Sequence, residues 1–278
     1  MEIHYYGTAA AEGIPALFCE CEICRKASQA GGRERRTRSQ ARIDGELLLD
    51  FPPDTYAHMQ YQGLPVPQIE SLLITHSHSD HLFAEDFWAR LPDVGKLQSP
   101  RALCVYGSAA VIEKIRTSLD TTRLEQTKRL VLNEVKPFEA YLIGAHTVTP
   151  LPANHDPLSG PFIYLIQKGQ TSFLYANDTG LFPDETWDWL ERKRPVLAGV
   201  SLDCTMAFAP CPPEWGHLNL EGCCTVRQKL CQLGCTDAST RYILNHFSHN
   251  GLATHADLCQ KAEPLGFIVA YDGMTATV

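Results

Sequence analysis

Four side chains that commonly bind metal ions lie within residues 76–81, namely His76, His78, Asp80 and His81. They follow a short apolar run, residues 71–74, and precede a helix-like segment. Because alternate residues of an extended chain point to one side, His76 and His78 are expected to face a common point, while the last two side chains reach a second. Imidazole and carboxylate groups suit zinc, iron or manganese, and a pair of such ions is suited to hydrolysis.

Other ligand-type side chains stand just past the ends of further strand-like runs, at Asp50, His155, Asp178, Asp203 and His246. Loops at one edge of a sheet are where rigid scaffolds hold chemistry, so these groups are expected to meet the His-rich segment. The predicted ligands are His76, His78 and His155 for one ion, and Asp80, His81 and His246 for the other, with Asp178 bridging. Together they predict a dinuclear active site.

A second group of potential ligands is the triplet Cys19, Cys21 and Cys24. This spacing is poor for mutual disulfides but suits three corners of a tetrahedral zinc site. His249, three residues after His246, is the expected fourth ligand. Four protein ligands leave no open position, so this zinc would be structural. The alternative is three free surface thiols, which are vulnerable to oxidation.

The elements that must position these side chains alternate along the 278-residue chain, which predicts an α/β layered fold. Strands are expected at 46–50, 71–75, 103–106, 147–150, 162–167, 171–175, 196–203, 241–245 and 267–271, and helices at 84–91, 109–119, 183–192, 220–233 and 254–265. No repeat or linker divides the chain, so one domain over 1–278 is expected, with the cysteine-rich loop at 19–24. Segment 113–141 is the least readable and could hold an insertion or a flap.

Composition limits the classes of function. The formal net charge of −8 disfavours a broad nucleic-acid-binding surface. No apolar run is long enough to cross a bilayer, and the first residues lack the pattern of a signal peptide. Without an export signal, the 11 cysteines are expected to be reduced thiols and metal ligands. A cytoplasmic protein is therefore expected.

The order of ligands at strand ends resembles the metallo-β-lactamase superfamily, and the resemblance covers most of the chain. It implies an α/β fold of the four-layer αβ/βα sandwich type, with the metals at one sheet edge. It also implies that Asp50 supports a metal-binding histidine from behind. The glycine that usually follows this aspartate is replaced here by Phe51, so the local turn departs from the family pattern.

The cysteine triplet narrows the resemblance. The segment from Gly7 to Cys24, with His246 and His249, is similar to PhnP, the phosphodiesterase family of the carbon–phosphorus lyase pathway. That similarity implies cleavage of cyclic phosphodiesters of ribose and a structural zinc held by three cysteines and one histidine. The same N-terminal segment resembles the pyrroloquinoline quinone biosynthesis family PqqB. Because PqqB-like chains typically lack the full His-rich motif, its presence here favours hydrolysis.

Asp203 and His217 form a third constellation. Hydrolysis of a phosphodiester leaves an alkoxide that must be protonated, and a histidine held by a carboxylate is a suitable donor. The pair resembles the donor dyad of tRNase Z and PhnP-like enzymes, so the predicted catalytic residues are His217, Asp203 and the ligand Asp80. The alternative for His217 is a cap on the helix that begins near Leu220.

The leading expectation is a metal-dependent phosphodiesterase that hydrolyses a small cyclic or nucleotide-like diester through a metal-bridging hydroxide, with His217 as general acid. It would use two divalent ions, Mn or Zn or Fe, and one structural Zn. The alternatives are a PqqB-like cofactor-biosynthesis protein and a tRNase Z-like RNA-processing nuclease. No long nucleic acid and no membrane are expected as partners, and a homodimer is left open. The basic run at 33–38 would either grip a phosphate or lie in a solvated loop.

Overall fold

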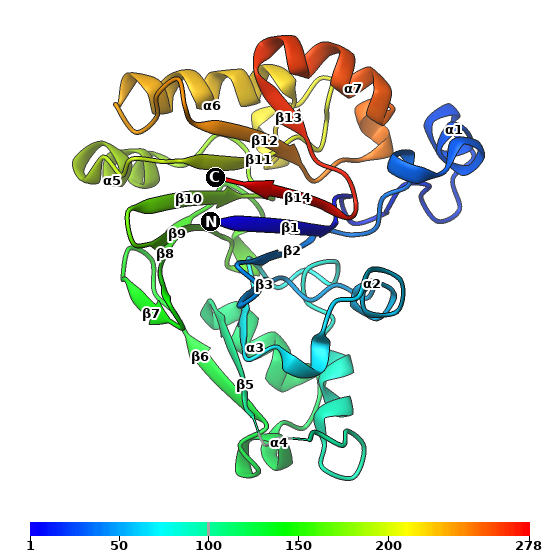
Figure 1. The fold of residues 1–278 in the computed structure, drawn as a ribbon, viewed down its shortest axis with the longest axis vertical. Helices are drawn as coiled ribbons and strands as arrows, with labels where there is room; N and C mark the ends of the chain where they lie inside the picture. The colour runs from blue at the N-terminus through cyan, green and yellow to red at the C-terminus, as the bar shows by residue number, and fades with distance from the viewer. Residues whose placement is uncertain (99–100) are drawn as a thin grey trace.

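A computed structural model describes residues 1–98 and 101–278, which form two seven-stranded sheets packed face to face (Figure 1). The first sheet has the order β14 (Met274–Thr277), β1 (Glu2–Gly7), β2 (Gln40–Ile43), β3 (Leu47–Leu49), β4 (Ser71–Leu73), β5 (Leu103–Gly107) and β6 (Leu130–Glu134). The second has the order β13 (Phe267–Val269), β12 (Arg241–Asn245), β11 (Gly199–Asp203), β10 (Thr171–Ala176), β9 (Phe162–Lys168), β8 (His146–Pro152) and β7 (Tyr141–Ile143).

Both sheets are mixed in direction. Strands β3 to β6 of the first sheet are parallel, as are β10 to β13 of the second. The carboxyl ends of these parallel strands therefore lie at one edge of each sheet, which is where ligands bind in open α/β sheets. The remaining neighbours pair antiparallel, and β1 and β14 bring the two chain ends side by side.

The helices are α1 (Glu22–Ala30), α2 (Thr55–Gln62), α3 (Ala109–Ser118), α4 (Thr122–Gln126), α5 (Asp184–Lys193), α6 (Leu220–Gln232) and α7 (His255–Ala262). Short 3₁₀ turns are η1 (Gly32–Glu34), η2 (Val66–Gln68), η3 (Ala84–Arg90), η4 (Pro157–Ser159), η5 (Pro213–Trp215), η6 (His249–Gly251) and η7 (Glu263–Leu265). Side-chain caps fix the starts of helices α6 and α7. Asn219 accepts from the Gly222 N–H at the start of α6, and Thr254 forms a capping box with Asp257 on α7.

Three buried apolar cores separate four layers. The central core lies between the sheets and includes Tyr5, Leu49 and Tyr175. Helices α5, α6 and α7 cover the outer face of the second sheet, whereas α3 and η3 cover that of the first (Figure 1). This arrangement confirms the expected four-layer αβ/βα sandwich. Among the described residues, no helix has both the length and the apolar character of a bilayer span.

Several expected elements differ from the structure. Segment 113–141, the least readable in the sequence, supplies the end of α3, helix α4 and the edge strand β6. The expected helix at 84–91 is the 3₁₀ segment η3. The helix expected at 254–265 ends at Ala262, where Pro264 cannot continue the α-helical ladder. Strands β1, β2, β6, β7 and β14 and helices α1, α2 and α4 were not expected.

Candidate functional site

Three buried residues at strand ends have left-handed backbone conformations, with φ of +66° at Asp50, +51° at Asp178 and +61° at His246. Such a conformation costs a residue other than glycine about 1–3 kcal/mol, and it persists only where its surroundings hold it. Asp50 directly follows β3 and His246 directly follows β12, whereas Asp178 lies two residues after the end of β10. These turns direct the three side chains toward a shared region. Backbone strain is thus concentrated where the sequence predicts the ligands.

The first histidine cluster comprises His76, His78 and His155. Nδ1 of His78 lies 3.0 Å from Nε2 of His76 and 3.2 Å from Nε2 of His155. The three nitrogens lie within 4.8 Å of one another. They therefore form the triangular group of donors that the sequence assigned to one ion.

The second cluster comprises Asp80, His81, Asp178 and His246, all of them buried. Oδ2 of Asp178 lies 2.6 Å from Nε2 of His81 and 3.2 Å from Nε2 of His246. The same oxygen is 3.5 Å from Nε2 of His76, in the first cluster. Asp178 therefore lies between the two clusters, as a bridging ligand must.

The outward-facing nitrogen of each clustered histidine has its own polar partner. The pairs are His76 Nδ1 with Thr75 Oγ1 at 3.1 Å, His78 Nε2 with Asp156 Oδ2 at 3.2 Å, His81 Nδ1 with Asp50 Oδ2 at 2.7 Å, His155 Nδ1 with the Gly216 carbonyl at 3.2 Å, and His246 Nδ1 with Thr205 Oγ1 at 2.8 Å. Metal-bound histidines almost always donate their second N–H in this way. The partners orient five rings so that their other nitrogens converge.

The charges and polar atoms of this region fit bound cations. Burial alone would lower the pKa of His81, but the charges of Asp80, Asp50 and Asp178 outweigh it and hold that pKa well above its ordinary value. Oδ1 of Asp178 is buried without a hydrogen bond. Imidazole nitrogens that face each other need a proton or a metal ion between them. The donor set is consistent with a dinuclear metal site whose loading would release protons.

The predicted dyad also comes together. Nδ1 of His217 lies 3.1 Å from Oδ2 of Asp203, whose other oxygen accepts from the Leu218 N–H at 2.9 Å. Burial would raise the pKa of Asp203, but His217 lowers it to about 2. Burial would likewise lower the pKa of His217, yet Asp203 raises it. The alternative role of His217 as a helix cap is wrong, because Asn219 caps α6.

Members of both clusters, together with His217 of the dyad, line one cleft of about 590 Å³. Its lining also includes Ala10, Ala11, Glu12, Thr205, Met206, Trp215, Ser248 and Asn250. His217 lines this cleft through a partly exposed ring, whose Nε2 has no hydrogen-bond partner among the described residues. A group placed in the cleft can thus meet the candidate ligands and the proton on His217.

The cysteine triplet meets His249 as predicted. Nδ1 of His249 lies 3.5 Å from Sγ of Cys19 and 3.5 Å from Sγ of Cys21, and the four donor atoms lie within 4.8 Å of one another. Burial would raise the pKa of Cys21, but the Cys24 N–H and His249 lower it to about 6. Thiolate is the form that binds metals, so this group is suited to hold a structural ion. None of these three cysteines forms a disulfide bond.

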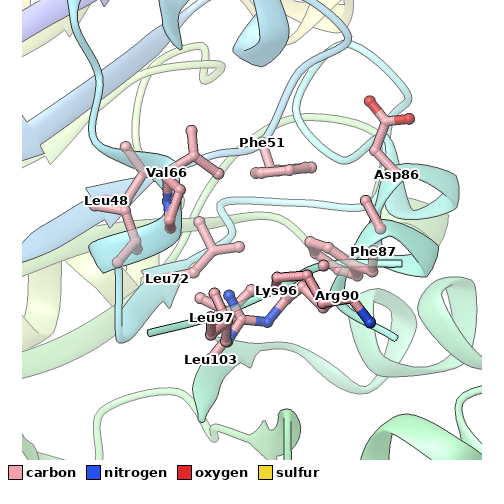
Figure 2. A pocket seen from close by; sticks show the side chains of 14 residues that line it. Leu48, Phe51, Val66, Leu72, Asp86, Phe87, Arg90, Lys96, Leu97 and Leu103 are labelled. Atoms are coloured by element: carbon pink, nitrogen blue, oxygen red, sulfur yellow. The ribbon is translucent and has the colours of Figure 1, made fainter. Parts of the chain in front are cut away.

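A separate apolar cavity of about 230 Å³ lies on the outer face of the first sheet (Figure 2). Leu48, Leu72 and Phe87 form its walls, and Arg90 and Lys96 lie at its lower side in this view. No histidine or cysteine is among its described lining residues. Phe51 connects this cavity to the site, because its N–H donates to the His81 carbonyl at 2.7 Å. The chemistry belongs to the cleft instead.

The basic run at 33–38 mixes exposed and buried side chains, with Arg33 and Arg35 exposed. Arg36 is buried and donates to the Thr8 hydroxyl and the Ala270 carbonyl. Arg38 pairs with Asp54 at 3.0 Å, and Arg33 stacks on Tyr271 at 4.0 Å. These side chains join the N-terminal loop to the rest of the fold.

Sequence reasoning missed the residues that hold the ligands and shape the cleft. The Thr205 hydroxyl accepts from His246 and donates to Asp203 at 2.9 Å. Oδ2 of Asp156 lies within hydrogen-bond distance of Nε2 of His78. Asp156 directly follows the predicted ligand His155, which is a signal that could have found it, whereas Thr205 had none. Trp215 carried no such signal, because only the folded loop brings it to the cleft.

Comparison with known proteins gives one family and several partial relatives. A family model described as Beta-lactamase superfamily domain matches residues 46–247. An octanoyltransferase from Porphyromonas gingivalis is 28% identical over 160 residues, which are 55% of this chain and 30% of that protein. A ribonuclease Z from Listeria welshimeri is 27% identical over 94 residues, 32% of this chain and 29% of the relative. The matched regions thus span less than a third of either relative.

Solved structures match over the whole chain. A diphosphatase of the PhnP family has a TM-score of 0.73 at 22% identity, covering 100% of this chain and 97% of that one. Zn²⁺-bound PqqB from Methylobacterium extorquens has a TM-score of 0.72 at 18% identity, covering 100% of both chains. At these identities the two structures show the shared fold alone.

Proposed function

Because the chain belongs to the metallo-β-lactamase superfamily, we propose that it is a metal-dependent phosphodiesterase acting on a small cyclic or nucleotide-like diester. The observation that carries the proposal is the Asp203–His217 pair, which opens into the same cleft as the two clusters. A thioester gives a thiolate leaving group, which has less need of such a donor. Fold alone would not distinguish these substrates.

Two divalent ions held by the seven ligands would supply activated water and neutralise charge on phosphoryl oxygens. The chain's own residues do the rest. Thr205 and Asp203 hold the rings of His246 and His217 on one side, and Asp50 holds His81 on the other. The proton on Nε2 of His217 passes to the departing alkoxide, while Asp203 stabilises the charged ring before that transfer.

Two other functions remain as alternatives within the same fold. One alternative is a PqqB-like role in cofactor biosynthesis, since PqqB shares the fold, and the other is an RNA-processing role like that of the partly matched ribonuclease Z. The net charge of −8 favours a small substrate over tRNA. Elemental analysis separates hydrolysis from the PqqB-like role, because hydrolysis requires two active-site ions beside one structural zinc, whereas zinc alone favours PqqB.

The direct test is turnover of four substrates with Mn, Zn and Fe supplied in turn. The substrates are bis-p-nitrophenyl phosphate, a 2′,3′-cyclic nucleotide, a phosphoribosyl cyclic phosphate and a thioester. We expect metal-dependent hydrolysis of the diesters. Turnover of the thioester alone would overturn the proposed substrate class.

His217→Ala should keep both active-site ions and lose about 10²–10⁴ in turnover of the cyclic nucleotide, whose leaving group is an alkoxide. Turnover of bis-p-nitrophenyl phosphate should fall much less, because p-nitrophenolate leaves without a proton. His4→Ala, a half-buried histidine on β1, is the control and should leave both rates unchanged. Loss of metal from His217→Ala would instead make this residue a ligand.

A further inference from the structure

Trp215 is the one large aromatic side chain among the described residues that line the metal cleft. The other described lining residues are small, polar or histidine, apart from Met206. Trp215 is 52% exposed, so about half of a large apolar surface faces solvent. Isolated exposed apolar side chains are common, but one that forms the wall of a polar cleft is positioned to meet a ligand.

The loop that carries Trp215 is fixed directly to the candidate metal centre. Trp215 ends the turn η5, and the following Gly216 accepts from His155 through its carbonyl at 3.2 Å. Gly216 has φ of +68°, and a Cβ there would lie 2.9 Å from Cα of His155. The backbone beside the indole therefore touches a predicted ligand closely, and His217 follows two residues after Trp215. The indole has a defined place relative to both.

From this placement we infer that Trp215 is the stacking platform for a nucleobase, so that the substrate is a nucleotide-like diester with its phosphate at the metal clusters. The inference rests on the proposed phosphodiesterase function and deepens it. Every nucleobase has a flat π-face. Stacking on an aromatic side chain removes the facing surfaces of the base and of the side chain from water. The base would lie on the indole while the diester lies between the ligands and His217.

A sugar cyclic phosphate without a base would leave the Trp215 indole exposed to water. The cleft of about 590 Å³ lies within the range of pockets that enclose a whole small ligand. Stacking tolerates any base, since it uses the π-face instead of hydrogen bonds to base edges. The enzyme should therefore accept several nucleobases, with purines bound more tightly than pyrimidines because their faces are larger.

The test compares two substrates that differ only by the base, adenosine 2′,3′-cyclic phosphate and methyl riboside 2′,3′-cyclic phosphate. With metal-loaded enzyme, Trp215→Ala should raise KM for the adenosine diester by roughly 5- to 100-fold, with little change in kcat. Trp215→Phe should recover most of this loss, because it keeps a π-face. The methyl riboside should be hydrolysed equally by wild type and both variants.

Trp88→Ala is the matched control, since Trp88 is also 52% exposed but lies on η3, outside the cleft. It should leave both substrates unaffected. Equal losses for the two substrates in Trp215→Ala would mean that the residue only supports the His155 loop, and no loss would mean that the base lies elsewhere. Either result overturns the inference.

A second measurement separates failure of the inference from failure of the proposed function. AMP should quench the indole fluorescence of the metal-loaded wild type, and Trp215→Phe should remove this quenching. Quenching without turnover of either diester would sink the phosphodiesterase proposal and keep the nucleobase platform. Turnover of both diesters without quenching would keep the phosphodiesterase proposal and sink the nucleobase platform.

Discussion

His81 is constrained at both ring nitrogens by carboxylates. Nδ1 lies 2.7 Å from Asp50, and Nε2 lies 2.6 Å from Asp178, with all three side chains buried. Asp50 is itself fixed by the Thr75 N–H at 2.8 Å and by the Thr75 hydroxyl. This chain of contacts fixes the tautomer of His81 and raises the basicity of the nitrogen that faces the cluster.

Asp50→Asn should therefore weaken metal binding without removing a ligand. We expect affinity for the ion held by Asp80, His81 and His246 to fall about 10- to 100-fold, because the amide cannot support His81 in the same way. Competition with a chromophoric zinc chelator measures this change. Asp93→Asn, which removes only an exposed ion pair with Arg123, is the control. Unchanged affinity in Asp50→Asn would contradict the supporting role of Asp50.

At the residue scale, the sequence predicts the ligands far better than it predicts what holds them. His76, His78 and Asp178 are recognisable by side-chain type and by position after apolar runs. Thr205 is not, because its contact with His246 joins residues 41 positions apart and any threonine could occupy a turn. The role of Trp215 is equally hard to predict, because only the fold shows that a proline-rich loop places this side chain in the cleft.

At the scale of elements, the cysteine site connects the N-terminal loop to the turn η6. Cys21 caps α1 by accepting from the Cys24 N–H, while His249 begins η6 three residues after the candidate ligand His246. Nε2 of His249 lies 3.5 Å from Glu12, which lines the cleft. A metal at this site would therefore hold one side of the cleft in place, even though it takes no part in the reaction.

Cys21→Ser tests this connection with little change to the helix, because serine keeps an N-cap acceptor. We expect the variant to bind one zinc fewer per chain, to melt at a lower temperature and to keep both active-site ions. Cys104→Ser changes a cysteine on β5 outside every predicted cluster and is the matched control. Elemental analysis and calorimetry are the measurements. Full zinc content in Cys21→Ser would contradict the Cys₃His assignment.

Strands were predictable where their own side chains form a strongly apolar run, as in β4, β11 and β12. The strands missed include β1 and β14, which pair with each other between residues 2–5 and 274–277. Neither has a long apolar run of its own, and each is completed by a partner at the other end of the chain. Such pairing depends on the closed fold and has no local signature.

At the scale of the whole molecule, a buried polar network ties the first sheet to the site. Nδ1 of His58 lies 2.6 Å from Oε1 of Gln40, and Nε2 lies 2.7 Å from the Thr37 hydroxyl. Gln40 in turn donates to the carbonyl of Asp50 at 2.9 Å. Burial lowers the pKa of His58 to about 4, despite the nearby charge of Asp54. Burial therefore favours the neutral imidazole at this position.

The lowered pKa of His58 predicts that the fold loses stability in acid. The pKa of an unfolded histidine is about 6.5, so between pH 6.5 and 4 the unfolded chain binds a proton that folded His58 does not. Stability is full above that window and is lost as the pH falls through it. The loss assigned to His58 is about 2 kcal/mol between pH 7 and pH 5. His255, whose pKa is also lowered to about 4, acts in the same direction and must be separated by mutation.

Urea unfolding of wild type and His58→Gln, both stripped of metal with EDTA, isolates the contribution. The variant should be less stable at pH 7 because it loses a buried contact, yet the two free energies should approach each other by about 2 kcal/mol at pH 5. Leu64→Ala, a buried position just after α2, destabilises without titrating and should keep the wild-type slope. Parallel pH profiles for wild type and His58→Gln would show that His58 gains its proton as readily in the fold as outside it.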